Sequence, residues 1–114
     1  MRVNSNRSSI RVRLGPGLEI KGIVTDLNKA MQMEFVLEDI SNNGVGITTQ
    51  NMIDRSTKVK LAIGQPHLLI FEGVVVWCTE EQDHYRVGIK IEKGASQLSV
   101  LYEEFRKKME NYND

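Results

Sequence analysis

Apolar and polar residues alternate along most of the chain. In the stretch LEIKGIVTDL, Leu18 and Ile20 fall on one side of an extended backbone, and the charged residues that follow them fall on the other. Strict alternation is typical of a β-strand with one face in a hydrophobic core and one face in solvent. The pattern predicts about six strands, at residues 18–27, 33–40, 45–49, 57–63, 67–78 and 85–92.

Turn-forming residues separate the predicted strands. Gly, Asn, Asp and Pro recur between them, and the pattern of a crossover helix, which a parallel pair of strands needs, is absent. The strands are therefore expected to pair antiparallel, in a small barrel or a sandwich. The segment NKAMQM, residues 28–33, fits either a helical turn or a continuing strand.

The period of the pattern changes near the C-terminus. From Ser96 onward apolar residues recur at intervals of three and four, which predicts an amphipathic helix over about residues 96–112 that packs on the strands. Ser96 is the candidate N-cap. Glu103 and Glu104 each have a lysine four residues later, a pairing that stabilises the solvent side of a helix. The apolar positions are Leu98, Leu101, Phe105, Met109 and Tyr112.

Length and charge narrow the function classes. The chain has 114 residues, 40% of them apolar, which is enough for one hydrophobic core. Its 15 basic and 15 acidic residues cancel, and this argues against a surface that grips DNA or RNA through many phosphates. The charge is nevertheless uneven, because four arginines precede the first acidic residue, Glu19. A small anion needs only such a local cluster.

Aromatic content, cysteine usage and hydropathy give further exclusions. The aromatic residues do not cluster on a strand face outside Phe71 and Trp77, which disfavours binding of single-stranded nucleic acid. Cys78 is the only cysteine, so an internal disulfide is excluded, and we interpret it as a small buried apolar residue. No apolar run approaches the roughly 20 residues of a membrane-spanning helix. A cytoplasmic protein without membrane insertion is expected.

No catalytic or metal-binding pattern stands out. His67 and His84 do not show ligand spacing with Cys78, so no metal site is expected. The chain lacks a phosphate-binding loop, a dinucleotide-binding glycine motif and a motif for an activated nucleophile. We therefore expect a binding module without a cofactor, and not an enzyme.

The stretch EDISNNGVGI combines turn formers with functional side chains. An Asn-Gly pair between two strands is by itself a strong signal for a hairpin. The carboxylate of Asp39 is also able to accept two N–H donors from the edge of a guanine, and Ser41 has a hydroxyl to donate to a phosphate. Gly44 lets the backbone turn and lets a ligand approach closely. From these residues alone both interpretations remain open.

A second motif lies near the N-terminus, and the two motifs together favour the functional interpretation of this stretch. RSSIR places Arg7 and Arg11 four residues apart, and an Asp-x-Ser-x-x-Gly motif begins at Asp39, 28 residues after Arg11. The two motifs together resemble the PilZ domain family, bacterial receptors for cyclic di-GMP. EGVVVWC followed by YRVGIKIE is similar to the last barrel strands of that family, so the resemblance covers most of the chain. It implies a mainly β fold, a six-stranded antiparallel β-barrel with a C-terminal α-helix.

The resemblance also implies roles for five residues. Arg7 and Arg11 would hold guanine acceptors and phosphates, and Asp39 would meet the guanine N1–H and amino group. Ser41 would lie near the phosphate or base, and Gly44 would keep the turn open. The assignment to arginine is chemically apt, because a guanidinium binds phosphate oxygens and the guanine O6 and N7 pair bidentately.

The resulting prediction is a cyclic di-GMP receptor with a flexible arm at residues 1–17 and a barrel with its helix at 18–114. Ligand binding would order the arm and so change the surface that a protein partner meets. The alternative is an adaptor of the same fold that binds no nucleotide and acts only through protein partners. Many relatives have an arginine where this chain has Asn6, and its loss would either lower the affinity or change how many ligand molecules bind. A monomer or weak homodimer is expected.

Overall fold

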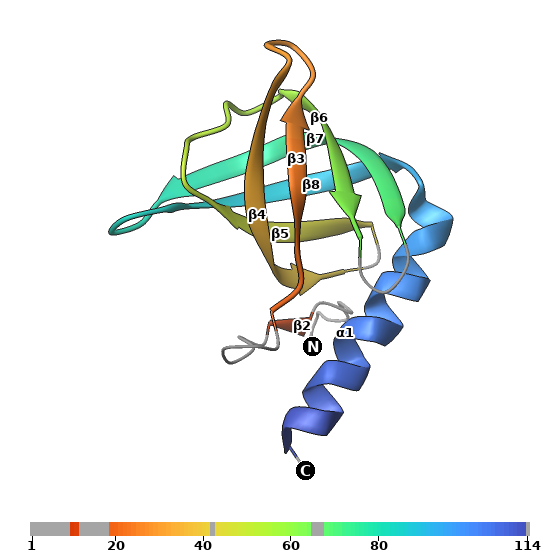
Figure 1. The fold of residues 1–114 in the computed structure, drawn as a ribbon. Helices are drawn as coiled ribbons and strands as arrows, with labels where there is room; N and C mark the ends of the chain where they lie inside the picture. The colour runs from red at the N-terminus through yellow and green to blue at the C-terminus, as the bar shows by residue number, and fades with distance from the viewer. Residues whose placement is uncertain (1–9, 12–18, 42, 65–67, 114) are drawn as a thin grey trace, which may run out of the picture.

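The structure is a computed structural model, and it describes residues 10–11, 19–41, 43–64 and 68–113. These residues form seven strands, one short 3₁₀ helix and one α-helix (Figure 1). The elements are β2 (Ile10–Arg11), β3 (Lys21–Asp26), β4 (Met31–Ile40), β5 (Gly44–Thr49), β6 (Lys58–Ile63), β7 (Leu69–Glu80), β8 (Tyr85–Lys93), η1 (Ala95–Gln97) and α1 (Leu98–Asn113).

Six antiparallel strands close into a barrel. Their order is β4-β3-β6-β7-β8-β5, and β5 pairs back with β4, so the sheet closes on itself. Closure gives the edge strands partners for the backbone groups that an open sheet would leave exposed. The barrel, followed by helix α1, confirms the fold predicted from the sequence (Figure 1). The two-residue β2 is an additional strand that pairs with the last residues of β4.

Alternate residues of the strands fill the barrel. Phe35 and Phe71 are among the largest fully buried side chains, and Phe105 of the helix joins them. Leu98 and Leu101 of α1 are also buried, so the first part of the helix packs its apolar side chains into the same core. Cys78 is half-buried and packs against the edge of this core, which makes it less buried than the sequence indicated.

The segment 28–33, which the sequence left open, is a turn that runs into a strand. β3 ends at Asp26 and β4 begins at Met31, which makes the pair a β-hairpin. The carboxylate of Asp26 accepts hydrogen bonds from the backbone N–H groups of Asn28 at 2.9 Å and Lys29 at 3.1 Å. Aspartate stabilises turns in this way because its short side chain reaches the backbone two or three residues on.

The start of helix α1 differs from the prediction. Ser96 lies inside η1 and is not the N-cap of α1, which begins at Leu98. The chain turns at Gly94, whose φ of 91° is a left-handed conformation that suits glycine. On the solvent side Glu103 pairs with Arg106 at 2.8 Å, three residues further on. The backbone freedom of Gly94, and not a serine cap, therefore sets the entry into the helix.

The turn between β7 and β8 contains a histidine between two carboxylates. His84 Nδ1 lies 2.7 Å from Asp83 Oδ1, and His84 Nε2 lies 3.1 Å from Glu81 Oε1. Hydrogen bonding to Asp83 raises the pKa of His84 above its ordinary value of 6.5, partial desolvation opposes this rise, and Glu81 adds to it. Protonated His84 is therefore favoured by the folded turn.

We expect this cluster to stabilise the fold more at acidic than at basic pH. Because the pKa of His84 is higher in the folded than in the unfolded chain, the stabilisation is complete below about pH 6.5 and is lost as the pH rises through the raised pKa. Urea unfolding across this window should show a decline in stability that His84→Gln removes. A pH profile that His84→Gln leaves unchanged would contradict the role of the cluster.

Candidate ligand-binding site

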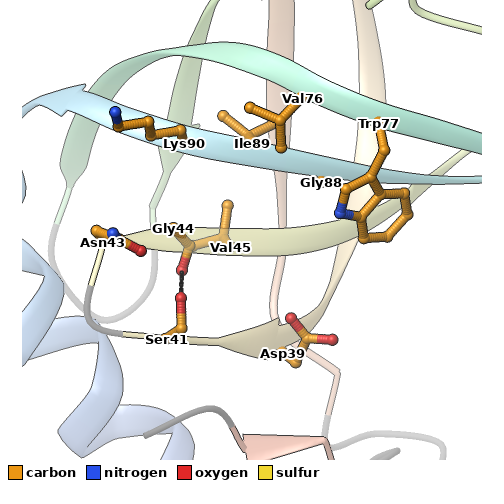
Figure 2. Close-up of a pocket in the computed structure, with 10 residues that line it drawn as sticks. All are labelled: Asp39, Ser41, Asn43, Gly44, Val45, Val76, Trp77, Gly88, Ile89 and Lys90. Carbon is orange, nitrogen blue, oxygen red and sulfur yellow. Dashed lines mark hydrogen bonds between the residues drawn. The ribbon is translucent and has the colours of Figure 1, made fainter. Parts of the chain in front are cut away.

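A pocket of about 410 Å³ opens on the outer wall of the barrel, where β4, β5, β8 and β7 lie side by side (Figure 2). Figure 2 shows Asp39 on β4, Ser41 just beyond the end of that strand, and the indole of Trp77 across the sheet from them. The lining residues are Asp39, Ser41, Asn43, Gly44, Val45, Val76, Trp77, Gly88, Ile89 and Lys90.

Two β-bulges bring the key side chains to the outer wall. The register of β4 shifts between Leu37 and Asp39, and the register of β7 shifts between Val75 and Trp77. Leu37 and Val75 are buried in the core, so strict alternation would also send Asp39 and Trp77 inward. The extra residue that each bulge inserts reverses this and turns both side chains outward.

A row of paired residues connects Asp39 to Trp77. Asp39 pairs with Gly46, Gly46 with Gly88, and Gly88 with Trp77. A Cβ atom at Gly46 would lie 2.6 Å from Asp39 Oδ1, and one at Gly88 would lie 2.3 Å from both Cε2 and Nε1 of Trp77. The carboxylate and the indole therefore lie over the two glycines, from opposite ends of the row. Gly46 and Gly88 form a strip without side chains, the glycine floor, and Gly88 also lines the pocket.

Gly88→Ala is expected to displace the indole of Trp77, because the added methyl group needs space that the ring occupies. Trp77 is the only tryptophan of the chain, so its fluorescence emission reports the change directly. It is 39% exposed and has room to swing outward, so we expect a shifted emission maximum with a small loss of stability.

The matched control is Gly64→Ala, where an added Cβ atom would meet nothing within 4 Å. This variant should leave the emission of Trp77 unchanged. Identical spectra for Gly88→Ala and the wild type would show that the indole does not lie over Gly88.

The β4–β5 turn forms another side of the pocket. The backbone N–H of Ser41 donates to the Gly44 carbonyl at 2.9 Å, and the Ser41 hydroxyl donates to the same oxygen at 3.3 Å (Figure 2). A Cβ atom at Gly44 would lie 2.6 Å from the backbone oxygen of Ile89, so a glycine is needed for β5 and β8 to approach here. Ser41 and Gly44 thus stabilise the hairpin through hydrogen bonds, and they also line the pocket.

The pocket combines several kinds of side chain. The side chain of Asp39 is 12% exposed, and its Oδ2 lies 3.5 Å from Nη2 of Arg86. The guanidinium of Arg86 lies 5.9 Å from the centroid of the Trp77 ring, within the range of a cation–π contact. Lys90 is an exposed cation at the lining. A carboxylate acceptor, an aromatic plane and an ammonium donor suit a flat polar ring that carries an anionic group.

Of the two predicted arginines, only Arg11 is among the residues that the structure describes. The register of β2 places Arg11 opposite Asp39, so the row of paired residues continues from the pocket onto a further strand. Arg7 lies outside the described residues. Asp39, Ser41 and Gly44 therefore line one pocket, and the backbone of Arg11 lies in register beside it.

Sequence reasoning missed Trp77, Gly88 and Lys90 as site residues. They are far from the Asp-x-Ser-x-x-Gly motif in the sequence, and only the strand order brings β7 and β8 beside β4 and β5. One feature of the sequence does point to Gly88. In YRVGIKIE, Gly88 takes an outward position between Arg86 and Lys90, and a glycine inside a strand often marks a close approach.

The fold and the pocket define a small β-barrel binding domain. The chain belongs to the PilZ domain family, because the model of that family, described as PilZ domain, matches residues 5–104. The match confirms the resemblance carried by the two motifs. Curated protein sequences give no match. Within the described ranges no helix is long and apolar enough to cross a membrane, and no three His, Cys, Asp or Glu side chains gather into a group that could hold a metal ion.

Solved structures share this fold. The PilZ domain of YcgR from Escherichia coli with c-di-GMP superposes with a TM-score of 0.75 at 15% identity, covering 96% of this chain and 98% of that one. The K. pneumonia MrkH–c-di-GMP complex gives 0.70 at 10% identity, over 95% of this chain and 55% of that one. The Bacillus subtilis inhibitor of motility, MotI/DgrA, gives 0.64 at 10% identity, over 94% and 52%. This chain thus spans about half the length of the last two.

Proposed function

We propose that the chain is a receptor domain for cyclic di-GMP and binds it in the pocket on the outer wall of the barrel. The observation that best supports this is the meeting of two distant motifs. The β2 register sets Arg11 opposite Asp39, at the pocket that Ser41 and Gly44 also line. The structures of YcgR and MrkH that share the fold are described as containing c-di-GMP, which is consistent with the proposal.

The chemistry of the site suits guanine and phosphate. Asp39 is the acceptor for the guanine N1–H and amino group, while Arg7 and Arg11 are the donors for guanine O6 and N7 and for phosphate oxygens. Trp77 offers a flat surface for base stacking. The hydroxyl bond of Ser41 is long, at 3.3 Å, and is readily exchanged for a bond to the ligand. A volume of about 410 Å³ is ordinary for a small-molecule site.

In this proposal the ligand joins the arm, residues 1–17, to the barrel, residues 18–114. The arm supplies the two arginines, and the barrel supplies the acceptor and the aromatic surface. Because residues 10–11 already pair with β4, the arginine contacts must exceed the entropy cost of fixing the rest of the arm. The ordered arm presents a new surface to a protein partner in the cytoplasm, and the domain itself catalyses no reaction.

Thermal unfolding with and without cyclic di-GMP tests the proposal. A ligand that binds only the folded state stabilises it by about 2.7 kcal/mol at 100 times its Kd. We expect cyclic di-GMP to raise the melting temperature and GTP at the same concentration to leave it unchanged. No shift with cyclic di-GMP would favour the adaptor alternative, in which the domain acts only through protein partners.

A further inference from the structure

Arg86 occupies an unusual place on the outer wall of the barrel. It lies on β8, two residues before Gly88, at a position where alternation predicts a solvated side chain. Its side chain is only 20% exposed, because it lies against Asp39 and Trp77. Arginine is seldom buried to this extent unless it is paired, so its contacts need an explanation.

The contacts of Arg86 are not those of an optimised structural ion pair. Nη2 lies 3.5 Å from Asp39 Oδ2, at the outer limit of a hydrogen bond. The Nε atom is buried and has no hydrogen-bond partner among the described residues. A buried unsatisfied donor costs stability. Arg86 is therefore poorly explained by the stability of the barrel alone.

Arg86 contacts two side chains that line opposite sides of the pocket, Asp39 and Trp77. Asp39 and Trp77 reach over the glycine floor from opposite ends of their row, and the guanidinium contacts both of them. Asp39 and Trp77 line the pocket, whereas Arg86 is not among the lining residues. It lies behind the two side chains that face a ligand.

We propose that Arg86 is a positioning residue of the ligand site, which braces the Asp39 carboxylate and the Trp77 indole from behind. The inference rests on the proposed function, because it takes these two side chains as the groups that meet the guanine. A carboxylate has about four lone-pair sites. Arg86 reaches one of them, on Oδ2, and it does so from outside the lining of the pocket. Arg86 therefore stays in place while the ligand binds.

A double-mutant cycle for cyclic di-GMP binding tests this role. Removing one charged hydrogen bond should weaken binding about tenfold, so we expect this loss for Arg86→Gln. Because Arg86 acts through Asp39, the double variant with Asp39→Asn should bind nearly as well as Asp39→Asn alone. Arg86→Lys keeps the charge without the planar fork and should fall between the wild type and Arg86→Gln.

Emission from Trp77 is an independent readout in the ligand-free protein. Arg86→Gln should shift it, because the cation leaves the ring, and an unchanged spectrum would contradict the contact between Arg86 and Trp77. The matched control is Arg55→Gln, which removes the same charge from an exposed position between β5 and β6. This control should change neither the emission nor the affinity. Melting temperatures of all variants identify any that fail to fold.

The outcomes separate the two proposals. Binding by the wild type that Arg86→Gln leaves unchanged would overturn only the role of Arg86. If the two losses multiply in the double variant, Arg86 acts independently of the Asp39 carboxylate, and its proposed positioning of Asp39 is overturned. Absence of binding by the wild type would refute the proposed function itself, and the role of Arg86 toward this ligand with it.

Discussion

Arg11→Ala is expected to weaken the binding of cyclic di-GMP at least tenfold and to leave the ligand-free protein almost as stable as before. A hydrogen bond to a charged group is worth about 1.5–3 kcal/mol, and a guanidinium can make two at once to guanine or phosphate. The stability should change little because β2 is only two residues long and lies outside the closed ring of six strands. Titration calorimetry and thermal unfolding measure the two effects.

Arg11→Lys is the matched control for charge. It keeps the positive charge but loses the fork that binds two acceptors, so its affinity should lie between those of the wild type and Arg11→Ala. A large drop in the melting temperature of ligand-free Arg11→Ala would contradict this account. It would indicate that Arg11 holds the barrel together, and its place opposite Asp39 would then be structural.

Phe105→Ala should give the largest loss of stability. Phe105 is fully buried where helix α1 meets the barrel, and truncation of a buried phenylalanine costs about 3–5 kcal/mol. For a domain of this size we expect a melting temperature lower by roughly 12–20 °C. The reason is the cavity left in a core that helix and strands share, and urea unfolding provides a second measurement.

Val100→Ala is the control on the same helix. Val100 is 41% exposed, so this substitution should change the free energy of unfolding by less than about 0.5 kcal/mol. Sedimentation of the wild type should give a monomer, because Leu98, Leu101 and Phe105 of α1 are already buried in its own core. A different outcome is a wild type that sediments as a dimer and a Phe105→Ala variant that stays folded but sediments as a monomer. That result would show that the helix projects and binds a second copy.

Strand content was the most predictable part of the fold. Alternation in LEIKGIVTDL and in TKVKLAI is strong, because one face of each strand is buried, and strands β3 (Lys21–Asp26) and β6 (Lys58–Ile63) lie within these stretches. Alternation does not distinguish a barrel from a sandwich, since both put apolar residues inside. That difference rests on the pairing of β5 with β4. The Ser96 cap was wrong because Gly94 provides the turn into the helix.

The candidate site was less predictable, for a physical reason. Strict alternation sends Asp39 and Trp77 into the core, and a bulge in each strand turns them out. The motif identified Asp39 without this knowledge, because it depends on side-chain chemistry and not on orientation. Trp77 and Gly88 have no motif of their own. Their part in the pocket follows from strand order and from the space that glycines leave.

The most direct test is calorimetric titration of the wild-type protein with cyclic di-GMP, with GTP as the control ligand. Saturable binding of cyclic di-GMP is expected, with a stoichiometry read from the same curve, and no comparable heat from GTP. Absence of heat, with no thermal stabilisation at high ligand concentration, would contradict it. The barrel would then be an adaptor without a nucleotide, and its protein partner would be the next object of study.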